Sequence, residues 1–181
     1  MDYNIDVRTI STSSSLFESY VRNEWLYVDK SEYAYKLLTM DEDPVFAFMA
    51  RPRRFGKSLF LSMLEAALMG KREMFEGLYL GSSDYGFHPY PVIHLDLSSI
   101  SSEGSSADNF SRQLNRIIGD TVRPYGVDVD LGDEPGNNLY NAIQGIYRKT
   151  GESVAVLIDE YDNPLTSSLN NPEGSLIRAK T

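Results

Sequence analysis

Apolar positions along this chain form two patterns. In one they are spaced like the residues of one helix face, and in the other they form short continuous runs. Helical spacing predicts a helix over residues 16–25, a second over 31–40 and a third over 57–69. Two later helices are predicted, one begun by the Ser105/Asp108 pair and one capped by Asn137 and ended by Gly151. The third helix is apolar nearly all round, which is typical of a buried helix.

Three short apolar runs predict strands at residues 45–50, 92–97 and 154–158. In the second run the side chains of residues 93, 95 and 97 should face one way and those between them the other. The third run is apolar throughout, as in a strand that is covered on both faces. Strands that alternate with helices favour an α/β fold with a mostly parallel sheet, preceded by a flexible polar lead-in over residues 1–15.

Gly56-Lys57-Ser58 lies where the first predicted strand gives way to the apolar helix, and this context predicts a phosphate site. Backbone N–H groups at a helix start have no internal partner and attract an oxyanion. Gly56 lets the backbone approach closely, Lys57 can reach the β- and γ-phosphates, and the Ser58 hydroxyl can ligate Mg²⁺. The alternative is an ordinary strand–turn–helix in which the triplet occurs by chance.

The loop departs from the pattern G-x-x-x-x-G-K-[ST] at its first position, where Arg51 stands, and Pro52 removes one N–H group. Because most of the cradle comes from the later amides of Arg54 to Ser58, we expect phosphate binding to survive. The candidate nucleotide-binding residues are Arg53, Arg54, Phe55, Gly56, Lys57, Ser58 and Leu59. Arg53 and Arg54 can clamp phosphate oxygens bidentately. Their alternatives are a solvated basic loop or a nucleic-acid contact.

Asp159-Glu160 follows the last apolar run, and a nucleotide hydrolase needs such an acidic pair. Ligands of parallel sheets gather at the carboxyl ends of the strands, so this pair and the Lys57 loop should share one edge. Asp159 would hold Mg²⁺ opposite Ser58, directly or through water, and Glu160 would polarise the attacking water. The alternative is a strand that merely ends in a polar loop.

Other polar residues favour structural roles. Asn163 and Pro164 are typical of a helix start, with Asn163 as N-cap, while Asp162 has an alternative place at the rim of the site. His94 fits a core histidine better than a catalyst. A structural role is favoured for Asp96, and the alternative is that its carboxylate approaches the site. Trp25 and Tyr27 fit packing rather than base stacking.

Composition narrows the function classes. The chain has 181 residues, no cysteine and two histidines, which excludes disulfides and disfavours a zinc cluster. With 17 basic and 26 acidic residues, the net charge of −9 gives no global attraction for nucleic acid or anionic membrane. No apolar stretch approaches the roughly 20 residues of a membrane span, and no signal-peptide pattern appears, so a cytoplasmic location is expected.

Several strings together resemble the AAA-ATPase-like family of bacterial proteins. They are Tyr27-Val28-Asp29-Lys30, Arg51-Pro52-Arg53-Arg54-Phe55-Gly56-Lys57-Ser58-Leu59, Phe75-Glu76-Gly77-Leu78-Tyr79, Pro91-Val92-Ile93-His94-Leu95-Asp96 and Leu157-Ile158-Asp159-Glu160-Tyr161-Asp162. The resemblance implies a three-layer P-loop ATPase domain over residues 16–181. It also implies Lys57 and Ser58 as Walker A, Asp159 and Glu160 as Walker B, and ATP with Mg²⁺ as ligands. Arginine is common in that family where the first glycine is missing here.

Family members usually run much longer and often carry a C-terminal domain that resembles PD-(D/E)XK nucleases. We therefore expect this chain to be the N-terminal portion of a larger protein, and its sheet to lack the strand that such ATPases insert between the Walker strands. Sensor and arginine-finger residues would lie elsewhere, which favours binding over hydrolysis, because a missing finger costs ~10³–10⁵ in rate. Two alternatives stay open: a nucleotide-binding switch with little turnover, and a nucleic-acid module that uses the Arg51/Arg53/Arg54 cluster.

Overall fold

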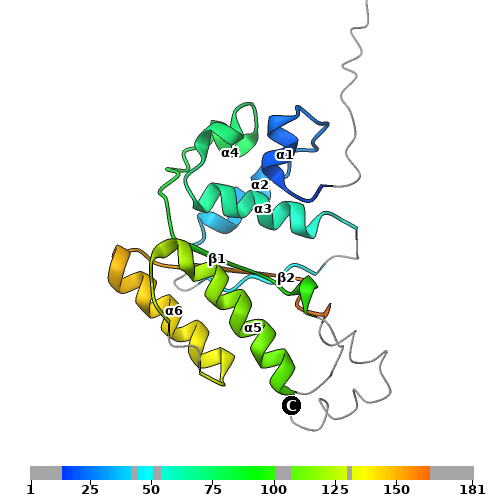
Figure 1. Ribbon diagram of the computed structural model, residues 1–181. Coiled ribbons are helices and arrows are strands. Elements are labelled where there is room, and N and C mark those ends of the chain that lie inside the picture. The colour runs from blue at the N-terminus through cyan, green and yellow to red at the C-terminus, as the bar shows by residue number, and fades with distance from the viewer. Residues whose placement is uncertain (1–13, 42–44, 51–53, 101–106, 130–131, 164–181) are drawn as a thin grey trace, which may run out of the picture. The chain divides into compact units, whose positions relative to one another are not determined.

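The computed structural model describes residues 14–41, 45–50, 54–100, 107–129 and 132–163. The chain forms two compact units, Met1–Pro89 and Tyr90–Thr181. The first unit is helical over its described residues, and the second carries a small parallel sheet (Figure 1). The predicted lead-in over residues 1–15 lies almost wholly outside the described residues, as does the Ser105 cap.

The first unit contains helices α1 (Phe17–Arg22), α2 (Ser31–Leu38), α3 (Lys57–Leu68), η1 (Arg72–Phe75) and α4 (Tyr79–Ser82). Its core is aromatic and aliphatic, with Phe17, Met63 and Phe75 almost fully buried. The ring centroids of Phe17 and Phe75 lie 5.1 Å apart, within the range of favourable aromatic pairs. α3 contributes most of its apolar side chains to this core, as its sequence predicts.

The end of α3 follows the local signals of the sequence. Gly70 has a φ of +76°, and the Lys71 N–H donates to the Ala66 carbonyl at 3.0 Å. This left-handed glycine just past the helix satisfies carbonyls of the last turn. A Cβ at Gly70 would lie 2.9 Å from the Phe87 carbonyl oxygen, so the packing of the next segment also requires glycine here. The helix predicted over residues 57–69 is thus observed to within one residue of its predicted end.

The second unit contains β1 (Val92–Asp96), η2 (Leu97–Ser99), α5 (Ala107–Val122), η3 (Arg123–Tyr125), α6 (Pro135–Thr150) and β2 (Ala155–Asp159). β1 and β2 pair in parallel, with Val92 opposite Ala155 and Asp96 opposite Asp159. α5 and α6 lie side by side on one face of this sheet (Figure 1). An α/β fold with parallel pairing is therefore confirmed.

The faces of β1 alternate as the sequence predicts. Ile93 and Leu95 are buried in the cluster that includes Ile118 and Ile146 of the two helices. Successive side chains of a strand point to opposite faces, so Asp96 and its register partner Asp159 belong to the face away from α5 and α6. Burial of the last strand on both faces was expected, and this is wrong at its end, where Ile158 is 46% exposed.

Side chains cover the edge of β1 that faces away from β2. The Tyr125 hydroxyl accepts from the Val92 N–H at 2.8 Å and donates to the Val92 carbonyl at 2.9 Å. The Thr121 hydroxyl donates to the His94 carbonyl at 3.3 Å. Such bonds satisfy backbone groups that an edge strand would otherwise offer to another strand. Among the described residues, side chains therefore cover the Val92 N–H and the carbonyls of Val92 and His94 on this edge of β1.

The strand predicted over residues 45–50 is not formed, and this prediction is wrong for the described structure. Those residues have no regular secondary structure, and Phe46 and Phe48 are 89% and 71% exposed. An apolar run becomes a strand only where a neighbour accepts and donates the hydrogen bonds of its backbone. Among the described residues the sheet contains only β1 and β2, and the run pairs with neither of them.

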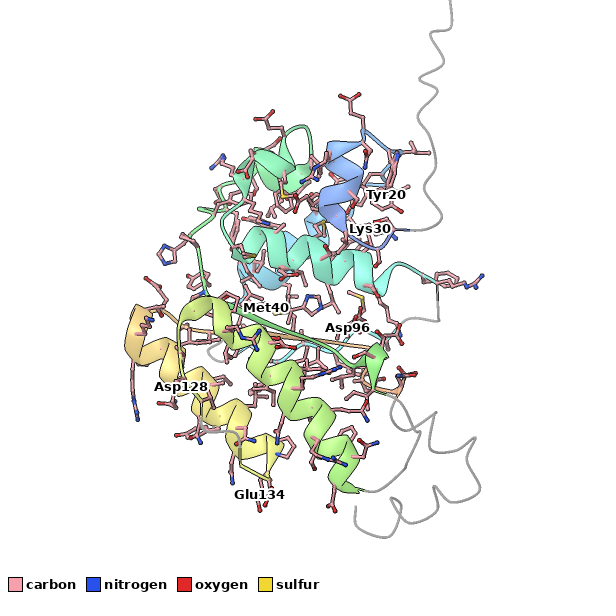
Figure 2. The ribbon with its side chains drawn as sticks, in the orientation of Figure 1. Tyr20, Lys30, Met40, Asp96, Asp128 and Glu134 are labelled. Atoms are coloured by element: carbon pink, nitrogen blue, oxygen red, sulfur yellow. The ribbon has the colours of Figure 1, made fainter. Side chains whose placement is uncertain are left out.

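The start of α6 also differs from its prediction. The helix begins at Pro135, with Glu134 as N-cap, rather than at an Asn137 cap. Proline fits the first helical position because its missing N–H would have no partner there. The Asn137 side chain instead donates to the Glu134 carboxylate at 2.6 Å. Figure 2 shows Glu134 at this end of the helix.

Candidate functional site

The loop before α3 leaves the start of that helix open to a ligand. Gly56 is the N-cap, with φ 75° and ψ 32°, and no side chain of the described residues caps the helix. The first helical bond runs from the Phe60 N–H to the Gly56 carbonyl at 3.0 Å, so the amides of Lys57, Ser58 and Leu59 have no acceptor within the helix. α3 has no acidic residue in its first turn, and its positive end therefore favours an anion.

Two left-handed residues shape this loop. Arg54, a non-glycine residue, has a φ of 67°, and Gly56 has a φ of 75°. A left-handed residue followed by a helical one turns successive N–H groups towards the same side, as in anion-binding nests. A left-handed non-glycine residue costs roughly 1–3 kcal/mol, and such residues are enriched at functional sites. The predicted phosphate loop therefore has a backbone suited to phosphate.

The side chains of this loop are accessible in the described structure. Arg54 and Phe55 are exposed, with Phe55 61% exposed, and Lys57 and Ser58 are half-buried. Leu59 is half-buried against the core of its unit. Arg51 and Arg53 lie outside the described residues, so the clamp role of Arg53 and the nucleic-acid alternative for the arginine cluster stay predictions.

The acidic pair ends β2 in the second unit. Asp159 is buried, with 7% of its surface exposed, and its Oδ1 accepts from the Glu160 N–H at 2.9 Å. Glu160 has a φ of 50°, another left-handed non-glycine residue. A buried carboxylate beside a strained residue is unusual for a plain strand end, because both features cost folding free energy.

Asp96 ends the neighbouring strand in register with Asp159. Its Oδ1 accepts from the Ser98 N–H at 2.9 Å, so it caps η2, and its side chain is exposed (Figure 2). The structural role that the sequence favours for Asp96 is thus observed. Within the described ranges, no group of three or more His, Cys, Asp or Glu side chains could hold a metal ion by itself. A cation here would depend on further oxygen ligands, such as those of a nucleotide.

The sequence gives little sign of two further groups of contacts. Asp29 accepts from the N–H groups of Ser31 and Tyr79, both at 2.8 Å. The buried Ser31 hydroxyl accepts from the Leu80 N–H at 3.0 Å. These contacts dock α4 onto the start of α2, so the Tyr27-Val28-Asp29-Lys30 string is at least partly structural. Its only signal in the sequence is an aspartate two residues before a serine at a helix start.

Tyr27 also packs in this unit, as its sequence context predicts. Its ring meets Phe17 with centroids 5.4 Å apart, and its hydroxyl donates to the Met63 sulfur at 3.0 Å. Burial raises the pKa of Tyr27 to about 12. Trp25 stacks edge-on against Tyr20, with centroids 5.4 Å apart.

A family model described as Predicted AAA-ATPase matches residues 12–179. This chain belongs to the AAA-ATPase-like family. It is 29% identical over 154 residues to a protein of Azotobacter chroococcum mcd 1 described as an uncharacterized protein in the vnfD 5′ region. That match covers 83% of this chain and 28% of the relative, so the chain spans just over a quarter of the relative's length. No solved structure matches the chain.

Membership of the family confirms the resemblance to it that the five sequence strings indicate. It supports nucleotide binding in general, because the family is described as a predicted ATPase. The roles of Lys57, Ser58, Asp159 and Glu160 remain predictions. Among the helices that the structure describes, none is long and apolar enough to cross a membrane.

Proposed function

We propose that this chain is the nucleotide-binding part of a Mg²⁺-dependent ATPase with a three-layer P-loop fold, in which the two units belong to one domain over residues 16–181. The observation that carries this proposal is the open start of α3. A left-handed glycine there precedes a lysine and a serine, in a chain whose family is described as a predicted AAA-ATPase.

The roles of the phosphate loop follow from its chemistry. The amides of Lys57, Ser58 and Leu59 donate to phosphate oxygens, and the lysine ammonium offsets charge on the β- and γ-phosphates. The hydroxyl of Ser58 and a carboxylate oxygen of Asp159 are hard oxygen ligands, which suit Mg²⁺. Ser58 and Asp159 would hold this ion, whose positive charge would offset the negative charge that develops on the phosphate oxygens.

Asp159 and Glu160 supply the other half of the proposed nucleotide site. Asp159 would hold the metal, and its Oδ1 accepts the Glu160 N–H at 2.9 Å. Glu160 accepts a proton from the attacking water, the general-base role, which typically contributes ~10²–10⁴ in rate. Asp159 lies at the carboxyl end of β2, where ligands of parallel sheets bind. The proposal requires the two halves to meet on one nucleotide.

Titration of fluorescent ATP with Mg²⁺ tests binding. We expect Lys57→Ala to lower affinity about tenfold or more, because a charge-assisted bond contributes roughly 1.5–3 kcal/mol. The matched control is Lys36→Ala, which removes the same charge from an exposed side chain, 61% accessible, in the same unit. Equal affinities of the two variants would contradict the proposal.

Single-turnover hydrolysis tests the chemistry. We expect Glu160→Gln to bind ATP like the unsubstituted chain and to hydrolyse it ~10²–10⁴ times more slowly. Binding with an equally slow rate in both proteins would favour the nucleotide-binding switch instead. Affinity for DNA that falls steeply with salt would favour the nucleic-acid module. A C-terminal nuclease-like domain in the full-length protein stays a proposal from the family resemblance.

A further inference from the structure

Asn163 ties the segment after β2 to the segment after β1. Its side-chain Nδ2 lies 3.2 Å from the Leu97 carbonyl oxygen, 3.1 Å from that of Ser98 and 3.3 Å from that of Ile100. Carbonyl oxygens only accept, so the amide nitrogen must face them. The two segments are more than sixty residues apart in sequence, and this side chain joins them.

The same residue closes the turn that carries the acidic pair. The Asn163 N–H donates to the Glu160 carbonyl at 2.9 Å. The turn is therefore held at its start by the register of Asp159 with Asp96, and at its end by the Asn163 amides. Between these two anchors lies Glu160, with its left-handed φ of 50°. A non-glycine residue keeps such a φ only where its surroundings over-determine it.

We propose that Asn163 is a positioning residue that holds Glu160 in its left-handed conformation and so fixes where the Glu160 carboxylate points. This inference rests on the proposed function for its catalytic consequence, although its conformational part does not. The reason is mechanical. Without the side-chain tie to η2, the turn can relax to a negative φ at residue 160, which swings the carboxylate away from its present direction.

A helix N-cap role for Asn163, which the sequence favours, concerns a different atom. An N-cap accepts through its side-chain oxygen, whereas the tie described here uses the nitrogen. Asn163→Asp separates the two roles. Aspartate keeps the size and the capping oxygen but replaces the donor with a charged acceptor facing three carbonyls. If the tie matters, Asp should be as harmful as Ala; if capping alone matters, Asp should behave like Asn.

Thermal unfolding of the full chain tests the conformational part without any activity. Glu160→Gly removes the cost of a side chain at positive φ and should raise Tm by about 1–4 °C. In the Asn163→Ala background the turn is free to relax, so the same change should give less than half of that rise. An equal rise in both backgrounds, or none in either, would overturn the inference.

Steady-state ATP hydrolysis tests the catalytic part. Asn163→Ala and Asn163→Asp should each lower kcat about tenfold or more, because a misdirected base loses much of its contribution, ~10²–10⁴ in rate. KM for ATP should stay within about twofold, since the phosphate loop lies in the other unit. Asn141→Ala and Asn141→Asp are the controls, because Asn141 is exposed on α6 in the same unit. They should leave both constants unchanged.

Failure of this inference is distinguishable from failure of the proposed function. If Glu160→Gln abolishes turnover while both Asn163 variants keep full kcat, Asn163 does not position Glu160. If the unsubstituted chain neither binds nor hydrolyses ATP, the proposed function fails, and the thermal comparison still decides the conformational role of Asn163.

Discussion

Replacing Gly56 with alanine is the sharpest perturbation of the phosphate loop. A Cβ built on Gly56 meets no atom of the described residues within 4 Å, so the substitution creates no clash among them. The loss of folding free energy on this substitution comes from the left-handed φ of 75° at residue 56. The same methyl at Gly86 also meets nothing within 4 Å, and the φ of Gly86 lies outside the left-handed region. The two glycines therefore differ in backbone conformation and not in available space.

The expected change in stability is the sum of two opposing contributions. A left-handed alanine costs roughly 1–2 kcal/mol, offset by about 0.5–1 kcal/mol from the lower entropy of its unfolded chain. The net loss for Gly56→Ala is thus about 0–1.5 kcal/mol, or a Tm lower by up to about 6 °C in a chain of this size. Gly86→Ala pays no conformational cost and should be neutral or stabilising by up to about 1 kcal/mol.

The assay combines thermal unfolding with titration of Mg²⁺ and fluorescent ATP. Alanine drives residue 56 towards a negative φ, which turns the neighbouring amides away, so we expect affinity to fall about tenfold or more. Gly56→Asn should lose less, because asparagine tolerates the left-handed region. Gly86→Ala should bind like the unsubstituted chain. The reasoning is refuted if the two alanine variants have the same Tm and the same affinity.

Two further predictions concern the helical unit. Ser31→Ala removes the acceptor of the buried Leu80 N–H and should cost about 1–3 kcal/mol, measured as a lower urea midpoint at constant m-value; the exposed Ser82→Ala should change stability by less than about 0.5 kcal/mol, and equal costs would contradict the role of Ser31. Tyr27 has a pKa of about 12 against 10.0 for the free side chain, so the folded state keeps its proton longer than the unfolded state does. The unfolding free energy should therefore fall as pH rises from about 10 to 12, and Tyr27→Phe should weaken that fall; an identical pH dependence in both proteins would contradict the shift.

Local signals in the sequence predict the helices well. The apolar run after Lys57 and the glycine at position 70 are sufficient to place α3 and its end, because a helix satisfies its own backbone. The run at residues 45–50 fails for the opposite reason. A strand depends on a partner elsewhere in the chain, and apolarity alone does not report whether that partner is present.

The residues of the candidate site are likewise found by local motif, and their wider support is not. The Gly56-Lys57-Ser58 triplet and the Asp159-Glu160 pair stand out by composition and by their places at element ends. The contacts of Asn163 with the η2 carbonyls and of Tyr125 with Val92 join residues tens of positions apart. An asparagine or a tyrosine in a turn has many possible partners, so only the folded chain reveals which one it binds.

The central claim is that the start of α3 and the end of β2 bind one nucleotide and one metal ion. A crystal structure with Mg²⁺ and a slowly hydrolysed ATP analogue tests it most directly. The account predicts phosphate oxygens on the amides of Lys57 and Ser58, and Mg²⁺ about 2.0–2.1 Å from the Ser58 hydroxyl. It also predicts that Asp159 contacts that ion directly or through one water. A nucleotide bound elsewhere, or an ion that Asp159 does not share, would contradict the account.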